Sequence, residues 1–471
     1  MSEFSWTQEE VRSALGIAPE SAGGTYSGVS TDTRKVEPGQ LFVALQGVSY
    51  DAHEFLAEAA SSGAVGAVVS RRPEQLPEGM QLWLVADTLA ALGKLGHHRR
   101  SALRGRVVGI AGSNGKTTTK DLLKAALGAS LRVHATSGNL NNQIGVPLTL
   151  LAVPDDAEVL VVEMGTNEPG EIAILGRIVE PDAAIITAIG EEHLEKLRDL
   201  QGVLEEELDA LEGLGAEGIA LVAEEPPELP ARARALLGGK RVRVAGWAAD
   251  ADLRPDGGPD SVQVLPDGTT RWSWRGVPVH VPLPGRHNVR NALLALGLAA
   301  EWGVEPAVAA RGIGQVTQPK LRGEWLQIGG MRVLADCYNS NPPSLHASVD
   351  LLASLPSQSA KVVVVGTMRE LGSSADEIHR RAAHAIASRV GDGIDRVVAT
   401  GAFADAFAGH AVELGDRLLL EPDPLAAYAA LQPALQGDET LLLKASRGEA
   451  LERWIPLLDR DWAALSSTPE A

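Results

Sequence analysis

Cysteine is almost missing from this sequence, since Cys337 is the single one in 471 residues. One thiol builds neither a disulfide framework nor a four-thiolate zinc site within one chain. Long apolar runs are missing too, because no uncharged stretch reaches the roughly 20 apolar residues of a membrane-spanning helix. The first 16 residues carry acidic side chains and no apolar core, which argues against a secretory signal. We therefore expect a cytoplasmic protein without structural disulfides.

Positive charge is scarce, because 42 Lys and Arg residues stand against 61 Asp and Glu, a formal net charge of −19. Such an acidic surface repels phosphate backbones, so nucleic acid is not an expected partner. A bound phosphate must then be held locally, by backbone N–H groups and a few basic side chains. Hydrophobic residues make up 45% of the chain, enough for ordinary cores. At roughly 150 residues per domain, the length predicts about three domains.

The apolar segments of the first half predict an α/β protein with a central parallel sheet. Residues 1–100 carry short apolar runs at 41–45 and 63–69, which indicate a small α/β unit. Beyond them, apolar strands alternate with helical segments, which is typical of a parallel sheet with helices on both faces. The strands expected there are 106–111, 158–163 and 183–189.

The second half of the chain divides near residue 318. Before that point, short antiparallel strands separated by turns are expected at 241–247, 261–266 and 270–283, followed by a helix from Asn288. A second α/β unit then follows, with strands expected at 331–337, 361–366, 396–401 and 440–446. The predicted units are therefore 1–100, 101–318 and 319–471.

The segment GIAGSNGKTTTKDLL, residues 109–123, lies where an expected strand ends and a helix begins. Glycines let the backbone wrap closely around phosphates, and a helix N-terminus presents free N–H groups to an anion. Lys116 is expected to neutralise the β- and γ-phosphates, and the Thr117 hydroxyl to reach Mg²⁺. Ile110 stands where a strict P-loop has glycine, and a glycine-rich turn without a ligand is the alternative. The residues predicted to bind a nucleoside triphosphate are Gly112, Ser113, Asn114, Gly115, Lys116, Thr117 and Thr118.

The spelling GSNGKTTTK resembles the Mur ligase family, which joins amino acids or peptides to a nucleotide-linked sugar acid. Further segments that resemble the family follow in its order, at 136–151, 163–172, 285–296, 336–344 and 444–452. Residues 30–47 and 50–55 resemble its uridine-nucleotide-binding domain. The segment TSGNLNNQIGVPLTLL is similar to the branch that adds D-alanyl-D-alanine to UDP-N-acetylmuramoyl-tripeptide.

The resemblance implies a fold and a reaction. The fold is a small α/β domain that binds the UDP-sugar, a central P-loop-type ATP-binding domain, and a Rossmann-like C-terminal domain that binds the dipeptide and completes the ATP site. In the reaction, ATP phosphorylates a carboxylate to an acyl phosphate, and an amine attacks it, giving an amide, ADP and phosphate. The implied cofactors are ATP and Mg²⁺, and the product serves peptidoglycan synthesis. No motif reports on the oligomeric state, and we expect a monomer.

The predicted catalytic residues are Lys116, Glu163, His193 and Glu207. The transferred phosphoryl group carries several negative oxygens, which lysine and a divalent metal must neutralise. Glu163 ends an expected strand and is expected to hold Mg²⁺ directly or through water. His193 occupies the family's metal-contacting position, so the expected metal ligands are Thr117, Glu163 and His193. Without the resemblance, a solvent-facing carboxylate and a loop histidine would be the simpler interpretations.

The resemblance also assigns residues to the nucleotide and to phosphate. Asn291 is expected near the adenine, and Arg322 and Asp336 near the ATP phosphates and ribose, contributed across a domain cleft. A cluster of amides is expected to orient phosphate, metal-bound water or a substrate carboxylate, unless it only forms a turn. This cluster is Asn139, Asn141 and Asn142.

Two further groups are assigned to the other substrates. Tyr338, Asn339 and Asn341 are expected to shape the dipeptide site, with basic groups for a carboxylate supplied around Lys444, Ser446 and Arg447. The uridine end is assigned to Thr31, Asp32 and Arg34, with Asp51 and His53 nearby. A turn of mutually satisfied polar groups is the alternative there.

The sequence departs from the family at two positions. The family usually has a lysine that CO₂ converts to a carbamate supporting a second Mg²⁺, whereas this chain has Glu207 there. Either Glu207 replaces the carbamate, through water or a small backbone shift, or the second metal site is weakened. A solvated helix face is the plainer interpretation of this acidic run. Thr367 stands where the family usually has aspartate, which affects details of the dipeptide or nucleotide site.

Two other functions stay open at this point. One is a sister ligase that attaches a single amino acid, or an enzyme like folylpolyglutamate synthase, although the segment NNQIGVPLTLL argues against both. The other is a catalytically weakened nucleotide-binding regulator, motivated by Glu207 and Thr367.

Overall fold

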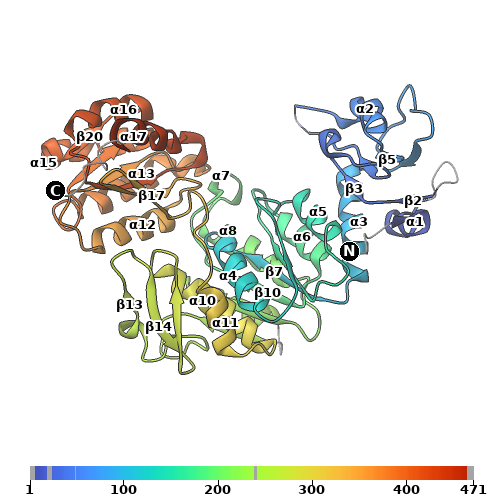
Figure 1. Cartoon of the computed structure of the whole chain (residues 1–471), viewed down its shortest axis with the longest axis horizontal. Helices are drawn as coiled ribbons and strands as arrows, with labels where there is room; N and C mark the ends of the chain where they lie inside the picture. Colours follow the sequence, from blue (N-terminus) through green and yellow to red (C-terminus); the bar gives the residue numbers. More distant parts are fainter. Residues whose placement is uncertain (1–5, 18–23, 48, 238–240, 464–471) are drawn as a thin grey trace, which may run out of the picture.

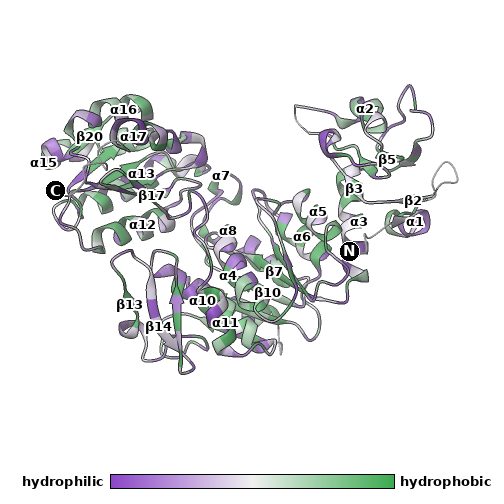
Figure 2. Cartoon of the chain, in the orientation of Figure 1, coloured by the Kyte–Doolittle hydropathy of each residue, from purple (hydrophilic) through white to green (hydrophobic). Residues whose placement is uncertain are grey.

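The computed structural model describes residues 6–17, 24–47, 49–237 and 241–463. Figure 1 shows three α/β units, with the N-terminal unit (blue) and the C-terminal unit (orange to red) at opposite ends. Apolar residues concentrate on the strands inside the central and C-terminal units (Figure 2). The predicted α/β class with parallel sheets is confirmed. Within the described residues, no helix has the length and apolar character to cross a membrane.

The N-terminal unit is a four-stranded parallel sheet in the order β3-β4-β5-β6. Its strands are β3 (Val29–Ser30), β4 (Leu41–Val43), β5 (Gly66–Val69) and β6 (Gln81–Leu84). A small ribbon of β1 (Trp6–Thr7) and β2 (Thr25–Tyr26) and the helices α1 (Gln8–Leu15), α2 (Leu56–Ser61) and α3 (Thr88–Ala102) accompany the sheet. Fully buried Phe42 and Trp83 anchor its core.

Helix α3 joins the N-terminal and central units. Its first turn is capped by the Asp87 side chain, which accepts hydrogen bonds from two backbone N–H groups of the helix. At its other end, buried Arg99 donates to the carbonyl of Val153 at 2.7 Å, and Arg100 donates to the carbonyl of Val179 at 2.9 Å. These bonds to buried and half-buried carbonyls fix the end of α3 against the central unit.

The central unit contains a six-stranded sheet, all parallel, in the order β12-β11-β10-β7-β9-β8. Its strands are β7 (Arg106–Ala111), β8 (Val133–Ala135), β9 (Val159–Glu163), β10 (Ala183–Ile186), β11 (Ile219–Ala223) and β12 (Arg241–Ala245). Its helices are α4 (Lys116–Gly128), α5 (Gly145–Leu151), α6 (Glu171–Val179), α7 (Leu194–Leu197), α8 (Leu200–Leu208), α9 (Glu228–Leu237), α10 (His287–Glu301) and α11 (Pro306–Ile313). Both faces of β7 are buried, because apolar clusters cover each side of the sheet.

The antiparallel prediction for 241–247 is wrong. Residues 241–245 of this segment form β12, which pairs in parallel with β11 at the edge of the central sheet. Helix α9 connects the two strands, and a crossover helix is what a parallel connection requires. The strand pattern of 219–223 was not recognised, so the turn-rich sequence beyond 247 decided the expectation. The following strands β13 (Gln263–Val264), β14 (Thr270–Trp274) and β15 (Val277–Val281) are antiparallel as predicted.

The C-terminal unit has a six-stranded sheet in the order β16-β17-β21-β18-β19-β20. Its strands are β16 (Glu324–Ile328), β17 (Met331–Asp336), β18 (Lys361–Val365), β19 (Arg396–Ala399), β20 (Leu418–Leu420) and β21 (Thr440–Lys444). All pair in parallel except β16, which makes an antiparallel hairpin with β17. The helices are α12 (Pro342–Ser354), α13 (Ala375–Ala387), α14 (Ala402–Ala406), α15 (Ala411–Leu414), α16 (Pro424–Leu431) and α17 (Trp454–Trp462).

The carboxyl ends of the two large sheets supply the chemistry-bearing side chains. In the central sheet, β7 lies between β10 and β9, so the chain order reverses at β7. Ligands of open α/β sheets bind at such a switch point. In the C-terminal sheet, Asp336 and Lys444 end neighbouring strands in register. The fold thus brings two sheet edges toward one cavity.

Candidate active site

A cavity of about 610 Å³ lies between the central and C-terminal units. Most of the residues predicted for nucleotide and catalysis line it, from Ser113 to Thr118 and at Glu163, His193, Asn291, Arg322 and Asp336. It is also lined by Asn139, Asn141, Asn142, Tyr338, Asn339 and Lys444. The sequence motifs therefore converge in space, although they are spread over more than 300 residues of the chain.

The phosphate loop, residues 112–115, connects β7 to α4. Gly112 and Gly115 have φ angles of 119° and 84°, in the left-handed region that favours glycine. A Cβ on Gly112 would lie 2.4 Å from Thr187 Oγ1, and one on Gly115 would lie 2.8 Å from Asn291 Oδ1. Only glycine allows this turn, which places the N–H groups of the first turn of α4 at the cavity. This is the backbone geometry that the sequence predicts for an anion site.

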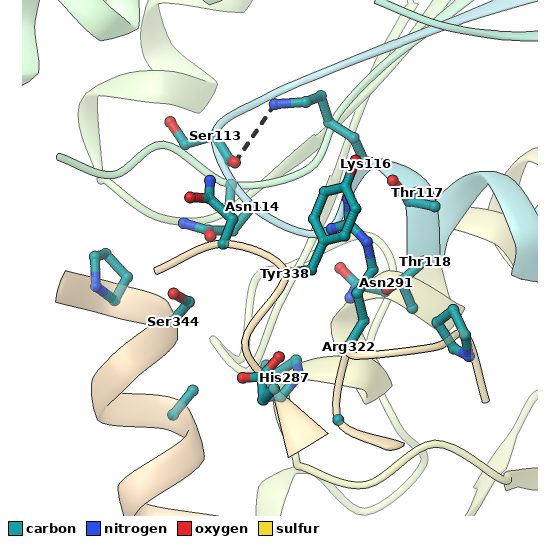
Figure 3. Close-up of a pocket in the computed structure, with 18 of the residues that line it drawn as sticks. Ser113, Asn114, Lys116, Thr117, Thr118, His287, Asn291, Arg322, Tyr338 and Ser344 are labelled. Atoms are coloured by element: carbon teal, nitrogen blue, oxygen red, sulfur yellow. Dashed lines mark hydrogen bonds between the residues drawn. The ribbon is translucent and has the colours of Figure 1, made fainter. Parts of the chain in front are cut away.

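Lys116 begins α4 and folds back over the phosphate loop. Its Nζ donates to the carbonyl of Gly112 and, at 3.4 Å, to the carbonyl of Ser113 (Figure 3). Burial opposes the charge of the ammonium, but Glu192, Glu207 and Glu163 raise the pKa of Lys116 above its ordinary value. Lys116 is therefore a fixed cation at the mouth of the phosphate loop.

Glu163 ends β9 beside the first turn of α4. Its Oε1 accepts hydrogen bonds from Thr117 Oγ1 at 3.2 Å and from Asn141 Nδ2 at 3.0 Å. Its Oε2 is buried, lies 4.0 Å from Lys120 Nζ and has no hydrogen-bond donor. Thr117, Asn141 and Glu163 thus meet as the resemblance implies.

Glu207 lies beneath the phosphate loop and outside the lining of the cavity. Its Oε2 accepts a hydrogen bond of 2.6 Å from the Gly112 N–H, and the side chain is fully buried. Burial raises the pKa of Glu207 to about 7, against the opposing attraction of Lys116. The interpretation of this acidic run as a solvated helix face is wrong for Glu207 and for buried Glu206.

Glu192 is a third buried carboxylate, which the sequence analysis missed. Its Oε1 lies 3.9 Å from Lys116 Nζ and its Oε2 lies 4.0 Å from His193 Nε2. Burial raises its pKa above the ordinary value. Its neighbour Glu191 is half-buried. Two glutamates precede His193, and the sequence does not show which of them lies at the site.

The three carboxylates around Lys116 are short of positive partners. Within the described residues, four buried carboxylate oxygens lack a hydrogen-bond partner, and three of them belong to Glu163, Glu192 and Glu207. Burying a charge without a partner is costly, so this arrangement fits a bound cation. No three His, Cys, Asp or Glu side chains of the described chain converge tightly enough to hold a metal alone. A hydroxyl and phosphate oxygens would have to complete such a site, as Mg²⁺ commonly requires.

His193 lies at the start of α7 with a φ of 51°. Its Nδ1 lies 2.5 Å from Glu370 Oε2 of the C-terminal unit. Burial opposes protonation, but the hydrogen bond with Glu370 and the charge of Glu192 raise the pKa of His193. Glu370 lines the cavity as well. Glu370 was not among the residues predicted from the sequence.

The C-terminal wall of the cavity is built around Asp336 and Lys444. Lys444 is almost fully buried, and its Nζ lies 2.9 Å from Asp336 Oδ2 and donates to the carbonyl of Asn339 at 2.8 Å. Ser348 Oγ donates to the same Asp336 oxygen at 2.6 Å. Lys444 is thus already paired with a carboxylate of the protein.

Tyr338 stands between two arginines at the edge of this wall. The guanidinium of Arg322 lies over its ring, 3.9 Å from the centroid, and that of Arg447 lies 5.6 Å away. Tyr338 and Arg322 line the cavity together with Lys116 and Asn291 (Figure 3). Asn291 is held by Asn288, whose Oδ1 accepts from its Nδ2 at 3.0 Å.

Several predicted residues serve the loops rather than line the cavity. Asn341 caps α12, accepting from the Ser344 N–H at 3.1 Å. Ser446 Oγ accepts from the Arg369 N–H at 3.0 Å. Thr367, the second departure from the family, accepts from the Ala402 N–H at 3.0 Å and so holds the start of α14.

His287, at the first turn of α10, is a further lining residue that the sequence analysis did not single out. Burial lowers its pKa to about 4, so its imidazole is neutral at physiological pH. It belongs to the segment 285–296, whose resemblance to the family was noted for Asn291 alone.

The residues assigned to the uridine end lie in the N-terminal unit. Asp51 Oδ1 pairs with His53 Nδ1 at 2.6 Å, and its Oδ2 accepts from Arg71 at 2.6 Å. His53 Nε2 accepts from the Ser70 N–H at 2.9 Å. Partial burial favours the neutral acid, but the bonds from His53 and Arg71 lower the pKa of Asp51 to about 2.

The other uridine residues follow β3. Asp32 caps the turn 33–35 and binds the guanidinium of Arg34 at 2.8 Å. Thr31 precedes it and is half-buried. Ser70 and Arg71, which complete the network at the end of β5, were missed because the sequence does not show that β5 ends beside His53.

Comparison with known proteins agrees with this geometry. The family profile of the Mur ligase middle domain matches residues 110–299, and that of the Mur ligase glutamate ligase domain matches 321–447. The UDP-N-acetylmuramoyl-tripeptide–D-alanyl-D-alanine ligase of Bacillus subtilis is 36% identical over 90% of this chain and 91% of its own length. The chain belongs to the Mur ligase family.

Solved structures of Mur ligases agree. A crystal structure of MurF from Acinetobacter baumannii superposes with a TM-score of 0.87 at 29% identity, covering 98% of this chain and all of that one. MurF of Thermotoga maritima, in complex with ADP, has the same fold, with a TM-score of 0.79 at 24% identity over 93% of this chain and 98% of that one. The three-domain fold expected from the Mur ligase resemblance is thereby confirmed.

Proposed function

We propose that this Mur ligase is the ATP-dependent enzyme that joins D-alanyl-D-alanine to UDP-N-acetylmuramoyl-tripeptide in peptidoglycan synthesis. One observation carries the proposal. A phosphate loop faces a cavity that the C-terminal unit completes. Beside the loop lie a fixed lysine and three buried carboxylates, each with one oxygen that lacks a hydrogen-bond partner. Relatives that match this chain over 90% or more of their own length carry the name of this reaction.

The cavity supports activation of the substrate carboxylate by ATP. The N–H groups of α4 and Lys116 would hold the β- and γ-phosphates and neutralise the charge on the transferred phosphoryl group. Thr117 and Glu163 would hold Mg²⁺, with His193 contributing from the facing loop. When bound, Mg²⁺ neutralises charge on the phosphate oxygens. Asn141 fixes the orientation of the Glu163 carboxylate through its 3.0 Å hydrogen bond.

The C-terminal wall would hold the remaining parts of the two substrates. Asp336 and Arg322 are placed for the ribose and phosphates of ATP, and the neutral His287 and Asn291 for the adenine side. Tyr338, Asn339 and the exposed Arg447 are placed for the dipeptide, whose terminal carboxylate Arg447 would pair. Because Lys444 is paired with Asp336, we assign it to holding that wall rather than to the dipeptide carboxylate.

The N-terminal unit would bind the uridine nucleotide. The carboxyl ends of parallel strands are the edge at which ligands usually bind. At this edge of the N-terminal sheet lie Thr31, Asp32, Arg34, Asp51 and His53. This unit lies beyond the central sheet in Figure 1, so the sugar and peptide of one long substrate would extend from it toward the phosphate loop.

Glu207 would serve the phosphate loop itself. Its bond to the Gly112 N–H fixes the loop entrance, and its negative charge faces Lys116. Glu207 is bonded to the loop and lies outside the lining of the cavity, which supports the second of the two hypotheses for this position, a weakened second metal site, over replacement of the carbamate. We also propose that the enzyme works in the cytoplasm and as a monomer.

Phosphate release from ATP tests the proposal. We expect release to require both UDP-N-acetylmuramoyl-tripeptide and D-alanyl-D-alanine, with ADP and the amide formed in equal amounts. A single amino acid in place of the dipeptide should give no product, whereas a sister ligase would accept it. ATP binding without stimulation by either substrate would identify a regulator instead and overturn the proposal.

A further inference from the structure

Two residues with positive φ angles face each other where the central and C-terminal units meet. His193 of the central unit has a φ of 51°, and Glu370 of the C-terminal unit has a φ of 64°. Left-handed backbone is uncommon for residues other than glycine; asparagine, aspartate and histidine adopt it more often than the rest, and glutamate does not belong to that group. Such outliers cluster at functional sites, where surrounding structure holds them in place. Here both outliers present their side chains to one another, with 2.5 Å between His193 Nδ1 and Glu370 Oε2.

The backbones at this contact are also joined. The Glu195 N–H, two residues after the histidine, donates to the carbonyl of Glu370 at 3.1 Å. Gly372 approaches so closely that an added Cβ would lie 2.9 Å from Glu195 Cα. The position of Glu370 relative to His193 is therefore fixed by main-chain contacts, and not only by two side chains.

The contact determines which nitrogen of His193 is free. With Nδ1 bound to Glu370, the other nitrogen, Nε2, points to the carboxylate cluster, 4.0 Å from Glu192 Oε2. A histidine that binds a metal usually donates its other ring N–H to a carboxylate or carbonyl, which fixes tautomer and ring orientation. The Glu370 side chain is 56% exposed, so the ion pair itself adds little stability. What the contact fixes is the orientation of the His193 ring.

We propose that Glu370 is a positioning residue that aims His193 Nε2 at the metal site, so that the site is complete only when the C-terminal unit is docked. This inference rests on the proposed role of His193 as a metal ligand. It assigns to the C-terminal unit a contribution to metal binding in addition to its contacts with substrates. Docking of that unit would then be coupled to phosphoryl transfer through one imidazole ring.

The chain offers a matched control. Arg381, also in the C-terminal unit, binds Glu191 at 2.6 Å, two residues before His193. This second ion pair joins the same loop to the same unit without touching the imidazole. A general loosening of the two units should therefore follow from Arg381→Met as readily as from Glu370→Ala.

The test uses the full-length enzyme with Mn²⁺ and ADP, and reads the ¹⁴N coupling of a Mn²⁺-bound imidazole by pulsed EPR. We expect a coupling in the wild type that is lost in His193→Ala. In Glu370→Ala we expect Mn²⁺ affinity to fall about tenfold, as for other residues that support a metal ligand, and the amplitude of the imidazole signal to fall with it. Glu370→Gln keeps an acceptor for Nδ1 and should retain the coupling, as should Arg381→Met. Thermal melting checks that each variant is folded.

The outcomes separate the two claims. A His193-dependent coupling that is unchanged in Glu370→Ala overturns the inference and leaves the metal role of His193 standing. A coupling reduced equally in Arg381→Met and Glu370→Ala also overturns it, because the effect is then loss of docking. The absence of any His193-dependent coupling overturns the metal role of His193 and the inference with it.

Discussion

Acidic and basic side chains gather in two regions of the molecule, and their electrostatic conditions are opposite. The phosphate-loop region contains Lys116 and the carboxylates around it, and the uridine region contains Asp51, His53 and Arg71. In the uridine region, Asp51 accepts from His53 and Arg71, and its pKa falls to about 2. Around Lys116, burial raises the pKa of Glu207 to about 7 and also raises that of Glu192. One region satisfies its charges within the protein, whereas the other leaves carboxylate oxygens without partners.

Under the proposed function, this difference separates a recognition site from a catalytic one. In the network Asp51–His53–Ser70 the polar groups already have partners, so the surface is preformed. The neutral uracil base of the proposed substrate would bind to it without breaking many of these hydrogen bonds. Around Lys116, binding of a cation and a phosphate would be favourable, because the carboxylate oxygens that lack partners would then acquire them. Strongly perturbed pKa values mark sites of chemistry for the same reason. Four predictions test this contrast.

The largest effect is expected from Lys116→Met. Without this cation, the phosphoryl charge faces three carboxylates, so the rate of phosphate release should fall by about 10³-fold. The rate is measured with all substrates saturating. Lys124→Met, on the exposed side of the same helix, is the control and should stay within about twofold of the wild type. A Lys116→Met enzyme that keeps a tenth of the activity would contradict the role of the lysine.

Glu207→Gln should change stability in a pH-dependent way. The folded-state pKa of Glu207 is about 7, above its ordinary value of 4.5. The contribution of Glu207 to the free energy of unfolding of the wild type therefore decreases as pH rises from 4.5 to 7, and levels off above that range. Glutamine cannot ionise, so the variant should gain up to about 3 kcal/mol over the wild type at pH 8 and nothing at pH 4.

Urea unfolding of both proteins at several pH values measures the effect. Glu205→Gln, on the exposed side of the same helix, should show no such pH-dependent difference. A Glu207→Gln variant that is less stable than the wild type at pH 8 would mean that the ionised carboxylate stabilises the empty phosphate loop.

A smaller effect is expected in the uridine region. Asp51→Asn removes the charge that holds both Arg71 and His53, and KM for UDP-N-acetylmuramoyl-tripeptide should rise about tenfold, the usual weight of a charge-assisted hydrogen bond. KM for ATP and kcat should not change, because the phosphate loop lies in another unit. Glu54→Gln, exposed on the same turn, is the control. A fall in kcat with unchanged KM would place Asp51 in catalysis and remove the contrast.

Much of this contrast was predictable from residues that are close in the sequence. The phosphate loop follows from GSNGKTTTK, since a strand, two glycines and a helix N-terminus fix its geometry locally. Glu163 and Asp336 were placed correctly because strand ends in parallel sheets share an edge. Asn291 was found through a motif, and it packs against Gly115 from 176 residues away.

The remainder depends on contacts that no local pattern reports. Glu192 is buried beside half-buried Glu191, and Glu207 is buried on the same helix as exposed Glu205. An acidic run in the sequence therefore does not show which of its carboxylates are buried. Strand β12 was misplaced because its partner β11 was not recognised. Ser70 joins His53 only through the pairing of β5. Glu370 meets His193 only because two units dock.

The smallest effect, and the sharpest statement about Glu207, concerns CO₂. A carbamate needs a lysine, and this chain has glutamate at the position where the family usually carries one. Glu207 is moreover already bonded to the Gly112 N–H at 2.6 Å. Phosphate release in CO₂-free buffer should therefore match the rate with added bicarbonate within about twofold, the scatter expected of an uninvolved site. Bicarbonate stimulation of fivefold or more would show that another lysine is carbamylated, and the carboxylates around Lys116 would then not be the complete set.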